Sequence, residues 1–142
     1  MTAFDLHIVF DCAEPDRVAR FWMRALGGYD FPTPVPDGFL TWDDWADAQQ
    51  IPVDQRPTGR TLVDKVRDRP DIFFLQVPEA KAVKNRVHLD IKVAPGLAGD
   101  ERRAAIEAEV ERLVGLGAQV LRRGDGDLVV MQDPEANEFC VA

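Results

Sequence analysis

Histidine and cysteine are scarce in this chain, which has two of each among its 142 residues. Cys12 and Cys140 are too few for a disulfide scaffold, so we expect a reducing compartment. Residues 1–5 lack the basic start and apolar stretch of a secretory signal, which predicts a cytoplasmic location. No apolar run is long enough to span a bilayer, so no membrane partner is expected.

Basic residues are also in deficit, with 17 Lys and Arg against 25 Asp and Glu and a net charge of -8. A chain this acidic repels phosphate backbones and anionic lipid, which argues against nucleic-acid or membrane binding. Phosphate-binding glycine loops, CxxC pairs and serine nucleophile motifs are absent too. The length and a hydrophobic content of 46% fit one globular domain over residues 1–142.

Hydrophobic periodicity predicts the same order of elements twice, a strand, a helix and three strands. In the first half the strands are expected at 4–12, 29–31, 38–42 and 71–77, with a helix from Pro15 to the Gly27-Gly28 stop. In the second half they are expected at 87–93, 118–121, 127–132 and 138–141, with a helix at 100–116 whose inner face holds Ile106, Val110, Leu113 and Val114. Residues 43–69 break the symmetry. They predict either a surface loop with a short helix or a lid over a pocket.

The two histidines hold equivalent places in the two halves. His7 and His88 are each a polar residue early in a predicted alternating strand that leads toward a helix. In the first strand His7 falls on one face with Val9 and Asp11, while Ile8, Phe10 and Cys12 fall on the other. This placement predicts one shared pocket built by duplication, with a metal ion as one option for its content.

Several segments resemble the vicinal oxygen chelate superfamily, which includes glyoxalase I, extradiol dioxygenases, fosfomycin-resistance enzymes and bleomycin-binding proteins. Four segments resemble the N-terminal part of sequences from that superfamily. They are His7-Ile8-Val9-Phe10, Ala13-Glu14-Pro15, Arg20-Phe21-Trp22 and Ala25-Leu26-Gly27. Segments 77–90 and 133–141 resemble a glyoxalase-like subfamily common in actinobacteria. The resemblance implies an α+β fold of two βαβββ modules, about 1–78 with an insertion at about 43–69, and about 86–142. Such modules form an open, barrel-like mixed sheet with a central cleft and helices outside.

The resemblance also implies a set of metal ligands. His7 and His88 match the first-strand ligands of the two modules, but the position of the usual last-strand glutamate falls on Cys140. Glu138 lies two residues earlier on the same strand face. A site with Cys140 would favour zinc, and one with Glu138 would also suit Fe, Mn, Ni or Co. A metal-free pocket stays open as an alternative.

Neighbouring residues complete the expected site. The superfamily has one more metal-ligand position, on the strand before the crossover to the second module. In this chain that position falls on Phe74 or Gln76, neither of which is a strong ligand. Asp90 shares a strand face with His88 and could orient its imidazole or act as a base. Lys81, Lys84 and Arg86 form a small basic cluster that could attract an anionic substrate or could simply be solvated.

The sequence is compatible with three functions. The chain could be a divalent-metal-dependent lyase or isomerase that polarises the paired oxygens of a small organic molecule in the cleft, with Glu138 moving a proton. It could instead be a non-catalytic protein that sequesters a small molecule, like the bleomycin-resistance proteins. It could also serve as a partner-binding or regulatory module. Superfamily members are often homodimers, so a homodimer is expected.

Overall fold

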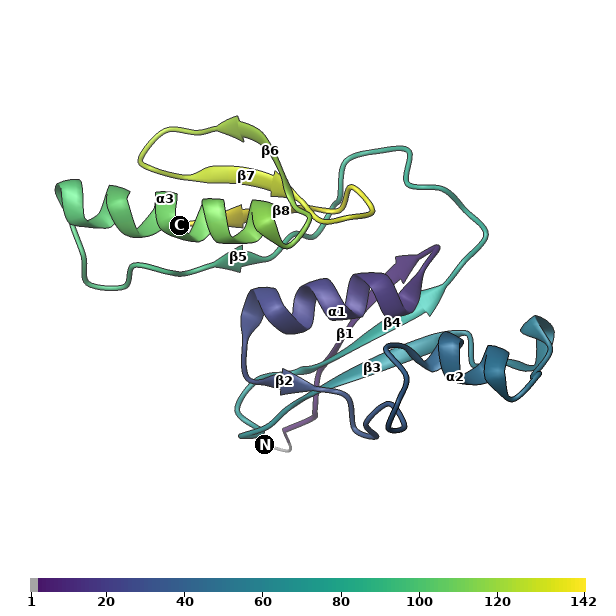
Figure 1. Ribbon diagram of the computed structural model, residues 1–142. Helices are drawn as coiled ribbons and strands as arrows, with labels where there is room; N and C mark the ends of the chain where they lie inside the picture. The colour runs from purple at the N-terminus through teal and green to yellow at the C-terminus, as the bar shows by residue number, and fades with distance from the viewer. Residues whose placement is uncertain (1–2) are drawn as a thin grey trace. The chain divides into compact units, whose positions relative to one another are not determined.

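The computed structural model describes residues 3–142, which divide into two compact units. The first unit comprises the chain up to Met23 together with Gly27–Ala80, and the second comprises Arg24–Leu26 and Lys81–Ala142. Each unit has a helix and a four-stranded mixed sheet, and neither sheet closes into a barrel within the described residues (Figure 1). This confirms the predicted α+β fold of two βαβββ modules. No helix in the described part of the chain is both long and apolar enough to cross a membrane.

The first unit builds its sheet in the order β1-β4-β3-β2. Its elements are β1 (His7–Cys12), α1 (Pro15–Leu26), β2 (Tyr29–Asp30), α2 (Trp42–Ala48), the 3-10 helix η1 (Val53–Gln55), β3 (Gly59–Asp64) and β4 (Asp71–Gln76). β1 and β4 pair in parallel, with His7 opposite Asp71, whereas β3 pairs antiparallel with both β4 and β2. The first strand of the unit therefore lies beside its last.

Helix α1 forms where the sequence predicts it. Pro15 stands in the first turn, where its missing N–H costs no helical hydrogen bond, and Gly27 ends the helix at a φ of 61°. Trp22 is 1% exposed and lies 5.2 Å from Phe10 of β1, ring centroid to centroid. Phe10 in turn stacks on Phe74 of β4 at 5.3 Å. These aromatic contacts fix α1 on one face of the sheet.

The alternation in β1 follows from this packing. Phe10 contacts α1, and Cys12 on the same face is 3% exposed. His7, Val9 and Asp11 alternate with them and are exposed. His7 therefore lies on the sheet face that α1 does not cover, as the period-two pattern predicts.

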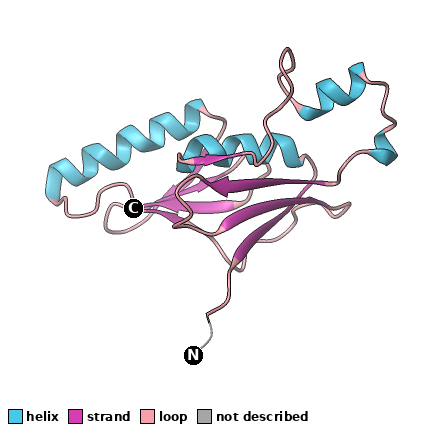
Figure 2. Ribbon diagram, turned by 90° about the horizontal axis from the view of Figure 1, so that it is seen from below, coloured by secondary structure: helices cyan, strands magenta, loops and turns pink. Residues whose placement is uncertain are grey.

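The predicted strand at 38–42 is wrong, because Thr41 begins a helix instead. The Thr41 hydroxyl accepts the Asp44 N–H at 3.0 Å, and the Asp44 carboxylate accepts the Thr41 N–H at 2.9 Å. This capping box satisfies amides at the start of α2 that would otherwise lack partners. Figure 2 shows α2 and η1 as short helical segments joined by loops.

The stretch at 43–69 contains more than the predicted loop and short helix. α2 is the short helix, but the same stretch also supplies β3, a full strand of the sheet. Leu62 and Asp64 of β3 are both completely buried and alternate with the half-buried Thr61 and Val63. The charged residues at 60, 64 and 65 interrupt the hydrophobic pattern, so the sequence does not predict a strand here. Asp64 can nevertheless be buried in the strand, because its charge is paired with that of Arg69.

The second unit orders its sheet β5-β8-β7-β6. Its elements are β5 (Asp90–Ile91), α3 (Gly99–Gly115), β6 (Gln119–Arg123), β7 (Val129–Gln132) and β8 (Glu138–Val141). The prediction for 138–141 is confirmed in full. Ile106, Val110 and Leu113 of α3 are buried as predicted, but Val114 is 48% exposed. At 100° per residue Val114 lies about 80° round the helix from Ile106, at the margin of the buried stripe.

The predicted strand at 87–93 shrinks to Asp90–Ile91, so His88 precedes the strand rather than opening it. Asp90 pairs with Cys140, and the Leu89 carbonyl accepts the Cys140 N–H. Upstream, the Asn85 N–H donates to the side chain of Glu138 at 2.9 Å rather than to a strand backbone. Residues 81–89 have no helix or strand.

Candidate functional site

Three residues of the second unit bring together nitrogen, oxygen and sulfur donors. One side-chain donor atom each from His88, Asp90 and Cys140 lies within 4.8 Å of the other two. The backbone explains the meeting, because the parallel β5–β8 register sets Asp90 opposite Cys140. His88 comes two residues before Asp90 and reaches it with Nδ1 3.3 Å from Oδ1. The structure thus places the predicted His88 and Cys140 in one cluster.

Burial and the neighbouring Asp90 favour a protonated Cys140 thiol when no cation is present. Burial raises the pKa of Cys140, and the negative charge of Asp90 and a hydrogen bond to it raise the pKa further. The thiol is 6% exposed, whereas His88 and Asp90 are exposed. A divalent cation would have to displace the thiol proton, so its binding would release acid and weaken at low pH.

The donor chemistry of the cluster fits a divalent metal ion. Imidazole suits first-row transition metals, a carboxylate adds negative charge, and a thiolate favours zinc over harder ions. Three protein ligands with two of them exposed leave a coordination position for a small molecule. Asp90 was expected to orient His88 or to act as a base and not to be a ligand, although its spacing of two residues from His88 was a signal that could have identified it as one.

Glu138 lies one pleat from Cys140 on β8 and is held by other partners. Lys81 Nζ lies 3.1 Å from its Oε2, and the Asn85 N–H donates to Oε2 at 2.9 Å. Burial alone would raise the pKa of Glu138, but the Asn85 N–H and the Lys81 ammonium outweigh it, so the pKa is lowered. Glu138 is therefore an ionised, partnered carboxylate, and it is not among the three clustered donors.

Of the predicted basic cluster, Lys81 is already paired with an acidic side chain. Its ammonium is bound to Glu138, while Lys84 and Arg86 are exposed. An anionic substrate at this point would have to compete with the Glu138 carboxylate for Lys81.

His7 belongs to the first unit, where it is exposed on β1. The expectation that Phe74 or Gln76 shares its face is wrong. His7 pairs with Asp71 in the parallel ladder, so its face continues through Phe73 and Leu75 of β4. Phe74 is fully buried on the other face, and Gln76 donates its side-chain amide to the Ala13 carbonyl at 3.1 Å. A register count one residue off moves every side chain to the wrong face.

Comparison with known proteins identifies relatives of the fold. Residues 7–142 match the family of the glyoxalase-like domain. No curated protein sequence matches the chain. A fosfomycin resistance protein, FosX, from Mesorhizobium loti has a similar structure, with a TM-score of 0.61 and 15% identity over 99% of this chain and 91% of that one.

Two further solved structures are similar. A glyoxalase/bleomycin resistance/dioxygenase family enzyme from Burkholderia phytofirmans PsJN gives a TM-score of 0.58 at 14% identity, covering 95% of this chain and 94% of that one. FosX from Listeria monocytogenes, solved with Mn(II) and sulfate, gives 0.59 at 9% identity, covering 99% and 92%. At these identities the likeness is one of fold.

Proposed function

Because the chain belongs to the glyoxalase-like domain family of the vicinal oxygen chelate superfamily, we propose that it binds a small organic molecule beside a divalent metal ion. The observation that carries the proposal is the convergence of His88, Asp90 and Cys140 within 4.8 Å. The Mn(II) complex of Listeria FosX supports a metal in a protein of this fold. The thiol of Cys140 favours zinc among Zn, Ni, Co, Mn and Fe.

In this proposal His88, Asp90 and Cys140 hold the ion, and His7 is a further ligand carried over from the family resemblance. When bound, the ion would act as a Lewis acid on paired oxygens of the substrate. Asp90 would have two functions, as a ligand and as the partner that orients His88. Cys140 would bring the negative charge that the family places on a glutamate.

If the protein is a lyase or isomerase, Glu138 is the proposed proton acceptor. The Asn85 N–H and the Lys81 ammonium hold its carboxylate in one position, which favours a defined direction of attack. Its lowered pKa makes it a weak base, so the proton it removes must be acidified, as at a carbon next to a polarised carbonyl.

A second candidate is a binding protein without catalysis. It is favoured by the same contacts of Glu138, because a carboxylate tied to Lys81 and Asn85 is a poor proton carrier. Such a protein would sequester its ligand, and a homodimer in the cytoplasm remains part of either proposal.

Metal analysis of tag-free protein purified without chelator tests the proposal. We expect about one equivalent of a divalent metal per chain, lost from His88→Ala and Cys140→Ala and retained by Cys12→Ala, which removes the other thiol. Partial loss in His7→Ala would support His7 as a ligand. Protein that neither carries metal nor gains thermal stability from Zn, Ni, Co, Mn or Fe would refute the metal site. Tight binding of a small molecule by such metal-free protein would leave the sequestering function.

A further inference from the structure

We propose that the first unit carries a binding site for a small organic acid with an apolar ring, built wholly from its own residues. Two cavities meet there. The arginine cavity is about 550 Å³ and is lined by Arg17, Arg20, Arg56, Arg60, Asp16 and Asp43, among others. The tryptophan cavity is about 340 Å³ and is lined by Phe31, Trp42, Trp45, Ala46, Ile51 and Pro57, among others. Asp43, Arg56, Pro57 and Arg60 line both cavities.

The arginine cavity lies on the α1 side of the sheet, away from His7. Arg60 shares a face of β3 with the buried Leu62 and Asp64, and its Nε lies 3.4 Å from a carboxylate oxygen of Asp16 on α1. His7 is on the face of β1 that α1 leaves uncovered. Neither His7 nor any of the clustered donors lines either cavity, so the organic-acid site shares no residue with the proposed metal site.

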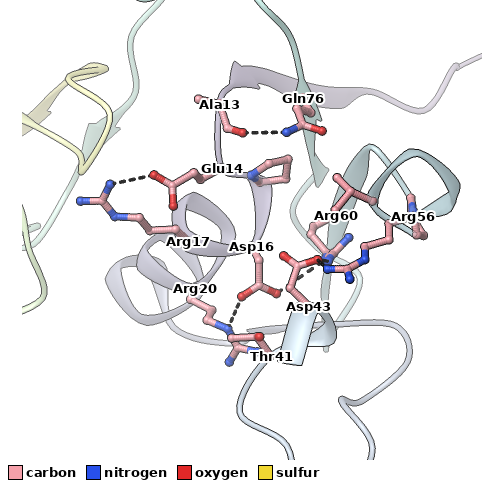
Figure 3. Close-up of a pocket in the computed structure, with 13 residues that line it drawn as sticks. Ala13, Glu14, Asp16, Arg17, Arg20, Thr41, Asp43, Arg56, Arg60 and Gln76 are labelled. Carbon is pink, nitrogen blue, oxygen red and sulfur yellow. Dashed lines mark hydrogen bonds and ion pairs between the residues drawn. The ribbon is translucent and has the colours of Figure 1, made fainter. Parts of the chain in front are cut away.

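The binding group for an acid is a pair of guanidinium groups with a weakly held carboxylate between them. Arg56 Nη1 and Arg60 Nη2 approach the same oxygen of Asp43 at 3.8 and 3.6 Å, distances too long for hydrogen bonds. The Arg56 and Arg60 side chains are 15% and 10% exposed, whereas that of Asp43 is 55% exposed. Figure 3 shows Asp43 beside Arg56 and Arg60. A ligand carboxylate could replace that of Asp43 and accept shorter hydrogen bonds from both arginines.

Both arginines are fixed in place before any ligand arrives. Arg56 donates from Nε and Nη2 to the Ile51 carbonyl at 3.0 and 2.9 Å, and its Nη2 also donates to Asp47 at 2.5 Å. Arg60 donates from Nη1 to the Gly59 carbonyl at 3.0 Å. These bonds hold both guanidinium groups, while Arg56 Nη1 and Arg60 Nη2 make the long contacts to Asp43. Such preorganisation lowers the entropy that binding must overcome.

Arg20 also lines the arginine cavity and adds a third positive charge to its wall. Its Nε donates to Asp16 at 2.6 Å, and its guanidinium lies over the Phe31 ring, 5.4 Å from the ring centroid.

The tryptophan cavity provides for the apolar part of the ligand. Trp42 and Trp45 pack edge to face, with ring centroids 5.5 Å apart. Ile51 and Pro57 add aliphatic surface beside them. The volume is at the lower end of the range for ligand pockets, about 300–1,000 Å³. An aromatic ring here, with its carboxylate on Arg56 and Arg60, matches both the shape and the charge of the site.

Isothermal titration calorimetry with benzoate, phenylacetate and 3-phenylpropionate tests the proposal, with 3-phenylpropanol as the uncharged comparison. At least one acid should bind with a Kd of about 1 mM or lower, and the alcohol should bind at least about tenfold more weakly. Arg56→Gln and Trp45→Ala should each weaken the acid about tenfold. Cys140→Ala should bind it as the wild type does, because Cys140 lines neither cavity.

Asp43→Asn gives the sharpest result, because it should tighten acid binding about threefold by removing the competing carboxylate. It keeps the Thr41–Asp44 capping box, so it should fold normally. Asp37→Asn, which removes an equal charge from an exposed residue outside both cavities, should leave the affinity unchanged. The site is refuted if none of the acids binds, if the alcohol binds equally well, or if Asp43→Asn binds no tighter than Asp37→Asn.

Discussion

Arg69 reaches the fully buried Asp64 with its Nη2 2.7 Å from the carboxylate Oδ1. The other carboxylate oxygen accepts the N–H groups of Asp68 and Arg69 at 2.9 and 3.0 Å. The guanidinium also donates to the Gly27 carbonyl at 2.8 Å and lies 4.4 Å from the Tyr29 ring. One ion pair thus joins the β3–β4 turn to the segment that follows α1.

Asp64→Asn should destabilise the protein strongly, because it leaves a guanidinium beside a buried amide. We expect the Tm to fall by roughly 10 °C. Circular dichroism during heating measures it. Asp68→Asn, at an exposed residue of the same turn, should change the Tm by no more than about 2 °C. Equal Tm values for the two variants would mean that the Asp64–Arg69 pair contributes little.

The pH dependence of stability should also trace to Asp64. The hydrogen bond from Arg69 lowers the pKa of Asp64, although burial acts in the opposite direction. A carboxyl whose pKa is lowered in the folded state stabilises the fold fully above its unfolded pKa, about 3.9, and loses that contribution as the pH falls toward the folded value. Urea denaturation between pH 7 and pH 3 should therefore show the wild type converging on Asp64→Asn below about pH 4. A gap that stays constant across this range would contradict the assignment.

Gly28→Ala should be coupled to Arg69, whereas Gly27→Ala should not, although both glycines have positive φ. A Cβ on Gly28, at φ 73°, would lie 2.6 Å from Arg69 Nη2, whereas one on Gly27, at φ 61° and ψ 157°, would meet nothing within 4 Å. Both alanines incur backbone strain of about 1–3 kcal/mol, and only that at residue 28 also displaces the arginine. Denaturant titration compares them in the wild-type and Arg69→Ala backgrounds. Removing Arg69 should lower the cost of Gly28→Ala and leave that of Gly27→Ala unchanged.

Thr41→Ala should weaken both the fold and the organic-acid site. Loss of the N-cap should lower the free energy of unfolding by about 1 kcal/mol. The start of α2 carries Trp42 and Asp43, so 3-phenylpropionate should bind several-fold more weakly. Thr58→Ala, at an exposed threonine outside both cavities, is the matched control. An unchanged acid affinity in Thr41→Ala would show that the cavities do not depend on the cap.

Zinc should protect Cys140 from alkylation but leave the rate at Cys12 unchanged. Cys140 is one of the three clustered donors, whereas Cys12 is buried in the first unit with its Sγ 3.5 Å from the Leu75 carbonyl. Peptide mass spectrometry after timed exposure to N-ethylmaleimide gives both rates in one sample. Addition of a chelator should restore the Cys140 rate. Equal rates at Cys140 with and without zinc would count against the metal site.

Period-two and helical patterns predicted the elements whose buried face is apolar. β1, α1 and β8 follow their patterns because Phe10, Trp22 and Phe139 occupy their inner faces. The strand β3 was not predicted, because its inner face includes the charged Asp64. This residue is buried through its ion pair with Arg69 and not through hydrophobicity. The sequence predicts a strand at the start of α2 because Phe39, Thr41 and Trp42 are residue types common in strands, whereas the contacts of Thr41 with Asp44 begin a helix there.

One candidate site could be predicted in part from the sequence and the other could not. Side chains alternate between the two faces of a strand, so counting residues is enough to place Asp90 and Cys140 on one face. The arginine cavity could not be found by counting, because Arg20, Arg56 and Arg60 come from three separate elements. Their meeting depends on how α2 and the loops around it pack, and no local pattern encodes that packing.

The parallel pairing of β1 with β4, and of β5 with β8, has a consequence for the kinetics of folding. The hairpins β3–β4 and β7–β8 close over short loops, whereas each parallel pair must first close a loop as long as its unit. We therefore expect the leading strand of each unit to dock last, onto a meander that has already formed. On that expectation the backbone around His7 and Asp90 takes its native position late in folding.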